Sequence, residues 1–415
     1  MQQTATIITI GDELLIGQTI DTNSAWMAQQ LNALGISVLR RIAIADDREA
    51  IIGALDEEIP RCDFLLITGG LGPTADDITK PVLAEYFGGK MVMDEAVLAH
   101  VQAIFSKRSR PMLERNTLQA QVPDCCEVLF NKLGTAPGMS FEKDGKVIVS
   151  MAGVPFEMMH IMEEGVLPRI RKMLKGNAIV HRSIVTAGEG ESFLAETIKD
   201  LEEALPAHIK LAYLPHAGMV RLRLTGKSMD EMHLIKEVEL RRDEIAGRLN
   251  YCVVSLEDLP LEQIVAKSFV AKGVTLGLAE SCTGGDIANR FTQIMGSSQF
   301  FNGSIVCYQT EVKERLLGVA KLTLAEHSVY SEEVALEMAR GASVALGASV
   351  GFGITGLLSG FPEGNIPVGT ICMAAVNGER EISHTVRCYS DRIRNKELAL
   401  THALLFLWKF INHKL

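Results

Sequence analysis

No apolar run in the sequence approaches the ~20 residues that a helix needs to cross a bilayer. The first residues, Met1-Gln2-Gln3-Thr4, lack the basic and apolar regions of a signal peptide. The eight cysteines include no C-x-x-C pair, which argues against a zinc site, and their spacing gives no disulfide framework. We therefore expect a cytoplasmic chain without a membrane partner, in which most cysteines are small buried side chains.

Little in the composition departs from that of an ordinary globular protein. The 415 residues are 47% hydrophobic and 22% charged, with 36 Gly and only 13 Pro, which excludes disorder, collagen and coiled coils. At ~150 residues per domain, this length predicts about three domains. The net charge of −10 argues against non-specific binding to nucleic acid, so we do not expect nucleic acid as a partner.

The charge is distributed unevenly along the chain. Residues 1–172 carry 16 basic and 23 acidic side chains, residues 173–258 carry 11 and 14, and residues 259–415 carry 14 of each. The acidic first third could supply carboxylates to a metal, and ordinary solvated surface acid is the alternative.

Strands and amphipathic helices alternate in the first third. Hydrophobic spacing predicts strands at 6–10, 38–44 and 64–67, and helices at 23–34, 48–59 and 76–87. This alternation predicts an α/β domain with a largely parallel sheet, covered by helices on both faces. We place this domain at 1–176, a small α+β module at 177–258 and a third, α/β domain at 259–415.

A Gly-rich loop follows the buried strand at 64–67 and precedes a helix. Gly69, Gly70 and Gly72 permit positive φ and a close approach of a ligand, and backbone N–H groups beside a helix N-terminus suit a phosphate. Asp76 and Asp77 could then hold a divalent cation that bridges phosphates. The alternative is a plain strand-to-helix turn with two capping acids.

Further acidic and amide side chains follow other strands at the same edge of the predicted sheet. These are Glu13, Asp21, Asn23 and Asp46, and together they form an acidic rim where α/β folds bind ligands. Each of them alone could instead be a helix N-cap.

The third domain contains a second possible site. The extended run 276–279 leads into Glu280-Ser281-Cys282-Thr283-Gly284-Gly285 and a helix at 286–294, whose free N–H groups could form an oxyanion hole. Ser281 needs a base, and Lys313 follows a second strand, predicted at 304–308. Cys282 is the competing nucleophile. The alternative reading makes Ser281 a helix N-cap and Lys313 a surface charge.

The motifs of the first third closely resemble the N-terminal domain of the CinA family. The resemblance is carried by segments 11–17, 21–23, 68–77, 131 with 134–138, and 153–158. It implies the molybdopterin-binding fold of the molybdopterin adenylyltransferases, and metal-dependent hydrolysis of ADP-ribose to AMP and ribose 5-phosphate. Carried over, Gly69, Gly70 and Gly72 would contact phosphate.

The same resemblance implies further ligands of this site. Glu13, Asp21, Asn23 and Asn131 would line the pocket, and the metal ligands would be Asp46, Asp76 and Asp77. The implied cofactor is a divalent ion (Mg, Mn or Co), and potassium is a further candidate.

The last third resembles the C-terminal CinA domain, a nicotinamide mononucleotide amidohydrolase. The matching segments are 279–285, 296–298, 308–313, 316–319, 353–356, 367–370 and 391–392. The resemblance implies Ser281 as nucleophile, Lys313 as base and Tyr308 as a positioning or proton-transfer group. The product would be nicotinic acid mononucleotide, formed without a cofactor. We expect substrate contacts from Thr283, Gly284, Gly285, Thr310, Thr355, Gly356 and Arg392.

Three positions of the last third depart from the family pattern. Thr310 replaces the usual Asn, Leu357 stands where Pro is common, and Lys396 stands where many relatives carry Arg. These departures concern the shape of the substrate pocket, not the Ser281 and Lys313 pair.

The middle module resembles the KH-like CinA domain, but it shows no clear G-x-x-G loop and no basic surface. We expect a structural or dimerising connector, and a homodimer whose partners are the small nucleotides nicotinamide mononucleotide and ADP-ribose. Two alternatives remain: a nucleic-acid-associated competence or recombination protein, and a molybdopterin-binding protein without hydrolase activity.

Overall fold

The computed structural model describes residues 3–74, 77–107, 111–174, 178–216, 218–378, 380–389 and 391–415. These residues form two compact units, one within 1–181 and 226–236 and the other within 182–225 and 237–415. No helix in the described ranges combines the length and the apolar character needed to span a bilayer.

The first unit is built on a six-stranded sheet in the order β2-β1-β3-β8-β7-β6, with a separate β4-β5 pair. Its strands and helices are β1 (Thr4–Ile10), α1 (Asp12–Leu15), α2 (Thr22–Ala33), β2 (Ser37–Ile44), α3 (Arg48–Glu58), β3 (Phe64–Thr68), α4 (Thr79–Tyr86), β4 (Met91–Met93), α5 (Glu95–Lys107), α6 (Glu114–Thr117), β5 (Gln121–Pro123), β6 (Glu127–Leu129), β7 (Gly138–Lys143), β8 (Lys146–Met151), α7 (Pro155–Ile161) and α8 (Leu167–Met173).

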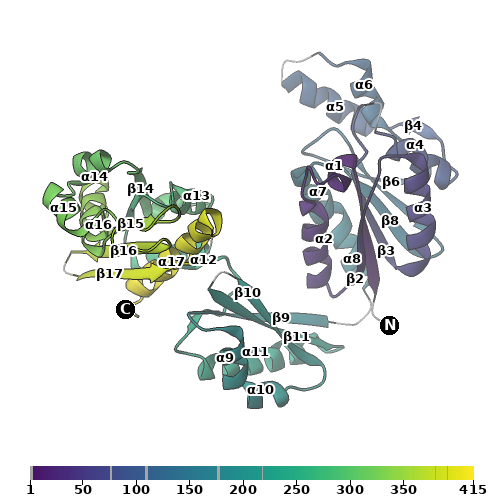
Figure 1. Cartoon of the computed structure of the whole chain (residues 1–415). Coiled ribbons are helices and arrows are strands. Elements are labelled where there is room, and N and C mark those ends of the chain that lie inside the picture. Colours follow the sequence, from purple (N-terminus) through teal and green to yellow (C-terminus); the bar gives the residue numbers. More distant parts are fainter. Residues whose placement is uncertain are drawn as a thin grey trace. The chain divides into compact units, whose positions relative to one another are not determined.

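The centre of this sheet is parallel, as the alternation predicts. Strand β1 pairs in parallel with β2 and β3, and β3 with β8, whereas β7 and β6 add as antiparallel strands. Helices α2, α7 and α8 lie on one face and α3 and α4 on the other (Figure 1). Strands β1 and β3 are buried on both faces, which explains their continuous apolar sequences.

Helix α4 begins at Thr79, three residues later than the spacing predicts. The reason is a local competition for hydrogen bonds. The carboxylate of Asp77 accepts the backbone N–H of Gly72 at 2.7 Å and that of Thr74 at 2.9 Å, so it closes the Gly-rich loop and does not cap the helix. Helix α4 therefore begins only after Ile78.

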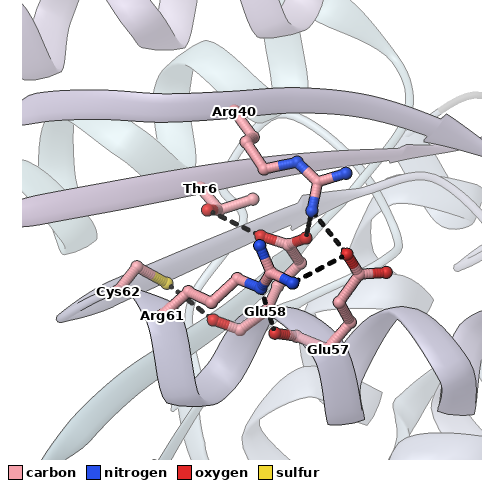
Figure 2. Close-up of polar contacts among 6 residues, drawn as sticks. All are labelled: Thr6, Arg40, Glu57, Glu58, Arg61 and Cys62. Carbon is pink, nitrogen blue, oxygen red and sulfur yellow. Dashed lines mark hydrogen bonds and ion pairs between the residues drawn. The ribbon is translucent and has the colours of Figure 1, made fainter.

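A buried carboxylate ties α3 to the sheet (Figure 2). Glu58, which is fully buried, accepts a hydrogen bond from the hydroxyl of Thr6 at 3.1 Å and forms an ion pair with Arg40 of β2. Arg40 also contacts the exposed Glu57 at 2.6 Å, which lowers the pKa of that carboxyl through the hydrogen bond and the opposite charge. These contacts link the last turn of α3 to the two neighbouring strands.

In the middle module, a four-stranded sheet in the order β10-β11-β9-β12 carries helices on one face (Figure 1). Its elements are β9 (Ala178–Ala187), α9 (Glu191–Thr197), α10 (Lys199–Glu203), β10 (Ile209–His216), β11 (Met219–Ser228), α11 (Glu231–Arg248) and β12 (Val253–Ser255). The backbone at Ile198 leaves the helical region and separates α9 from α10. Strand β12 was not predicted.

The last third forms a five-stranded sheet in the order β14-β13-β15-β16-β17. Its elements are α12 (Leu261–Lys272), β13 (Leu276–Glu280), α13 (Asp286–Thr292), β14 (Phe301–Val306), α14 (Thr310–Leu317), α15 (Lys321–His327), α16 (Glu332–Leu346), β15 (Val350–Leu357), β16 (Thr370–Asn377), β17 (Arg380–Arg387) and α17 (Arg392–Ile411). Helices α12, α13 and α17 cover one face and α14, α15 and α16 the other (Figure 1).

Candidate active sites

Ser281 and Lys313 lie together in the interior of the second unit. The Nζ of Lys313 is 3.0 Å from the Oγ of Ser281, and the two residues are 1% and 8% exposed. The same Nζ donates to the carbonyl oxygens of Cys307 at 2.6 Å and Tyr308 at 3.3 Å. Burial lowers the pKa of Lys313 from its ordinary value. The amine is therefore fixed in place and biased toward the neutral form that can accept a proton.

The parallel part of the sheet explains why these groups meet. Strand β13 pairs in parallel with β14 on one side and β15 on the other, so their carboxyl ends share one edge. The N–H of Ser281 donates to the carbonyl of Ile354 in β15 at 3.1 Å, and that of Cys307, just after β14, donates to the carbonyl of Glu280 at 2.8 Å. Strand β14 ends at Val306, so Tyr308 lies in the loop before α14.

The N-terminus of α13 is not an open oxyanion hole, which corrects the expectation from the sequence. The carboxylate of Glu280, which is fully buried, accepts the backbone N–H groups of Gly285, Ile287 and Ala288 at 3.0–3.1 Å. It also accepts the hydroxyls of Thr283 at 2.8 Å and Ser304 at 3.0 Å. Because the helix donors are occupied, donors to a developing oxyanion have to come from other groups that line the cavity.

A cavity of about 290 Å³ opens onto Ser281 and Lys313. Its walls combine aromatic, aliphatic and polar groups, namely Cys282, Tyr308, Gln309, Thr310, Val329, Tyr330, Gly356, Leu357, Leu358, Ser359 and Arg392. The guanidinium of Arg392 donates to the Tyr308 hydroxyl at 3.1 Å and to Ser359 at 3.0 Å. Of the substrate contacts expected in this unit, Thr310, Gly356 and Arg392 thus line the cavity.

The other four expected contacts shape the backbone and do not line this cavity. The hydroxyl of Thr283 is bonded to Glu280, and that of Thr355 donates to the carbonyl of Val329 at 2.9 Å. Gly284 and Gly285 have φ values of 64° and 95°, in the left-handed region that the turn before α13 requires.

Cys282 is a poor competitor for the role of nucleophile. Its thiol is buried, and burial raises its pKa to about 12. The reactive thiolate is therefore scarce near neutral pH, whereas Ser281 has a base within hydrogen-bond distance.

In the first unit, the Gly-rich loop meets residues from neighbouring strands. Gly69 and Gly70 have φ values of 114° and 65°, and a Cβ on Gly70 would lie 2.0 Å from the hydroxyl of Thr79 and 3.2 Å from the carboxylate of Asp46. Larger side chains are therefore excluded at Gly70 by the approach of α4 and of the loop after β2. The structure brings Asp46 to this loop, as the topology predicts.

The amide of Asn23 joins the same edge, since it donates to the carbonyl of Gly153 at 2.7 Å and to the hydroxyl of Thr68 at 3.3 Å. The carboxylate of Glu13 folds back over Gly11, where a Cβ would be 2.5 Å from it. Polar side chains thus gather at the sheet edge where β1, β3 and β8 end.

Two of the expected pocket residues hold local structure. Asp21 caps α2 by accepting the N–H of Ser24 at 2.9 Å, which is the alternative considered for it. Asn131, 2% exposed, closes the loop 131–136 through Ala136 and contacts Glu157 at 2.7 Å. Both side chains are therefore engaged with protein groups in this arrangement.

The expected metal ligands are only partly assembled. Asp76 lies outside the described residues, and Asp77 is engaged with the N–H groups of Gly72 and Thr74. Within the part of the chain that the structure describes, no three His, Cys, Asp or Glu side chains converge to hold a metal. One or two carboxylates beside a phosphate suffice for Mg²⁺, however, and Asp46 at the Gly-rich loop meets that requirement.

Known proteins resemble this chain along its full length. It is 42% identical over 410 residues to a "CinA-like protein" of Flavobacterium psychrophilum, with 98% of each chain covered. The chain belongs to the CinA family. A CinA-like protein of Cytophaga hutchinsonii is 39% identical over 400 residues, which cover 96% of this chain and 95% of that protein.

Three family models match successive parts of this CinA chain. They are described as a probable molybdopterin binding domain (residues 6–172), a damage-inducible protein CinA KH domain (181–253) and a CinA C-terminal domain (258–411). A solved structure of a protein named CinA from Thermoplasma acidophilum is 32% identical and covers 41% of this chain and 98% of its own, with a TM-score of 0.37.

The sequence pattern of this CinA chain did not indicate the buried contacts of Glu280, or that of Lys80 with Gln119 in the first unit. Glu280 stands in the motif beside Ser281, and an acidic residue just before a helix was the available signal. Lys80 lies on a face of α4 that also buries Leu83 and Ala84, so a lysine among core positions was the signal there.

Proposed function

We propose that the second unit hydrolyses the carboxamide of nicotinamide mononucleotide to nicotinic acid mononucleotide and ammonia. The observation that carries this proposal is the 3.0 Å contact between the Lys313 amine and the Ser281 hydroxyl at the base of the 290 Å³ cavity. The aromatic and aliphatic walls suit a planar ring, and Arg392 at the same cavity suits the phosphate.

The reaction follows from the hydrogen bonds of Lys313. Two carbonyls hold two N–H groups of the neutral amine, which leaves its lone pair for the Ser281 proton. Ser281 Oγ, having lost its proton to Lys313, bonds to the carboxamide carbon. Lys313 then returns the proton to the leaving nitrogen, and the C–N bond breaks to release ammonia. A water gives its proton to the same amine and attacks the acyl carbon. The bond from that carbon to Ser281 Oγ then breaks, and the amine returns the proton to Oγ, which restores the free serine and the neutral base.

For the first unit we propose a second activity, the metal-dependent cleavage of ADP-ribose to AMP and ribose 5-phosphate. The left-handed Gly69 and Gly70 and the approach of Asp46 support a pyrophosphate-binding loop. Asp46 would hold a divalent cation together with the substrate phosphates, and that ion would neutralise charge on the pyrophosphate. Asp77 would brace the loop through Gly72 and Thr74.

A second candidate function for the first unit is the binding of a molybdopterin-type ligand without hydrolysis. The observation that favours it is the family match at residues 6–172, whose description names molybdopterin binding. Both candidates place a phosphate-bearing ligand at the Gly-rich loop.

The test supplies nicotinamide mononucleotide and ADP-ribose separately to the purified full chain, with and without Mg²⁺, Mn²⁺ or Co²⁺, and identifies the products by mass spectrometry. Metal-independent ammonia release and metal-dependent AMP release support the two proposals. The variant Asp77→Ala is expected to lose AMP release while deamidation persists. If both activities fell together in folded protein, two separate sites would be the wrong description.

A further inference from the structure

Lys80 is a buried cation that the proposed reactions do not use. It lies on α4 directly after Thr79 and is only 6% exposed. Its Nζ donates to the backbone carbonyl of Gln119 at 2.7 Å, and this is its one hydrogen bond to another described residue. An ammonium carries three N–H donors, so this environment satisfies the charged group only in part.

Gln119 connects this lysine to the two loops at the carboxyl edge of the sheet. It is 3% exposed, and its side-chain amide donates to the carbonyl of Leu71 in the Gly-rich loop at 3.2 Å. Its side-chain oxygen accepts the hydroxyl of Thr135 in the loop 131–136 at 3.2 Å. The backbone and side chain of one residue therefore join Lys80, the Gly-rich loop and the loop 131–136.

The charge of Lys80 is not explained by stability. Burial lowers its pKa to about 8, and the negative charge of Asp77 opposes that shift without cancelling it. The ammonium is thus less stable here than in water. Methionine has a similar length and would fill the same space without that cost, so the charge calls for another explanation.

We propose that Lys80 is a positioning residue of the Gly-rich loop, whose buried ammonium, fixed by Gln119, favours the binding of a pyrophosphate group at that loop. The inference rests on the proposed function of the first unit and names the part of the substrate that this residue serves. Lys80 acts through two connections: the hydrogen bonds that run from Gln119 to Leu71, and the field that its charge exerts on Asp77 and on an incoming anion. In a water-poor interior, such a charge is weakly screened.

The test measures the binding of inorganic pyrophosphate to the full chain by calorimetry at pH 7 in a Mg²⁺ buffer. The variant Lys80→Met should weaken this binding by about tenfold, the size expected from the loss of one weakly screened charge. Gln119→Leu, which cuts the links to Leu71 and Thr135, should weaken it as well. Lys90→Met is the matched control, because Lys90 is an exposed lysine just beyond the same helix, and it should bind like the wild type.

Unfolding measurements separate this role from a structural one. Lys80→Met should keep the unfolding midpoint of the first unit at pH 7 or raise it, because a poorly satisfied charge is removed. A lower midpoint together with unchanged pyrophosphate affinity would overturn the proposal, and so would a wild-type chain that does not bind pyrophosphate. Binding is measured without turnover. A chain that binds pyrophosphate in a Lys80-dependent way but leaves ADP-ribose intact would therefore refute the hydrolase proposal alone.

Discussion

The amine of Lys313 lies 3.0 Å from the hydroxyl of Ser281, and both side chains are almost completely buried. A lysine that served only as a surface charge would extend into water. Here two main-chain carbonyls hold it and direct it at one hydroxyl. This relationship determines the expected effects of substitutions in the second unit.

Substitution of the two adjacent candidate nucleophiles should give opposite results. Ser281→Ala should reduce ammonia release from nicotinamide mononucleotide by at least about 1000-fold, because the attacking oxygen is lost. Cys282→Ala should retain most of the activity, since burial keeps that thiol protonated. An ammonia assay on both purified variants checks this, and the reverse pattern would refute the assignment of Ser281.

The pH dependence should report on Lys313. Its neutral form is the base, so deamidation should fall as the pH drops below the pKa of this group. Burial lowers that pKa from the ordinary value of 10.5, so the midpoint of the acid limb should lie below 10.5. A profile of kcat/KM against pH gives the midpoint. Lys313→Arg should be inactive throughout, because a guanidinium stays protonated. A flat profile would contradict the role of Lys313 as base.

Periodicity was sufficient for the central strands and first helices of the first unit, because the apolar runs at β1 and β3 and the helical spacing at α2 and α3 are local properties of the sequence. Local sequence was not sufficient where a side chain bonds to a distant or competing backbone group. Asp77 delays α4 by holding Gly72 and Thr74, and Glu280 occupies donors that a free helix would offer. Such contacts depend on the folded turn.

The candidate sites, too, could be predicted from the sequence only in part. A shared sheet edge follows from topology, and this brings Ser281 near Lys313 and Asp46 near Gly70. The sequence did not show which polar side chains remain open at that edge. Asn131 is bonded within its own loop, and the hydroxyl of Thr355 in β15 donates to the carbonyl of Val329.

Glu280 should be essential to the turn that carries Ser281. In Glu280→Gln, one acceptor oxygen becomes an amide donor that faces an N–H group of α13. We expect a loss of about 2–4 kcal/mol in the free energy of unfolding, together with lower kcat, because a buried donor is left unsatisfied and the helix loses its anionic cap. Urea unfolding and the ammonia assay measure the two effects.

Asp286→Asn is the matched control for this substitution. Asp286 begins the same helix and pairs with Lys396 at 2.8 Å, but both side chains are partly exposed. The control should change stability by less than about 1 kcal/mol. If the two substitutions changed the free energy of unfolding equally, the role of Glu280 as the anionic cap of this turn would be contradicted.

The buried Glu58 and the exposed Glu57 allow a comparison of neighbouring carboxylates in the first unit (Figure 2). Glu58→Ala should lower the free energy of unfolding by about 2–3 kcal/mol, because the fully buried Thr6 hydroxyl loses its acceptor and the last turn of α3 loses packing. Glu57→Ala should change stability little, since Glu57 meets Arg40 in water. Urea unfolding that monitors the first unit distinguishes the two variants. Neither change should affect deamidation in the second unit. If Glu58→Ala had the same free energy of unfolding as Glu57→Ala, the link between α3 and the sheet would not depend on the buried carboxylate.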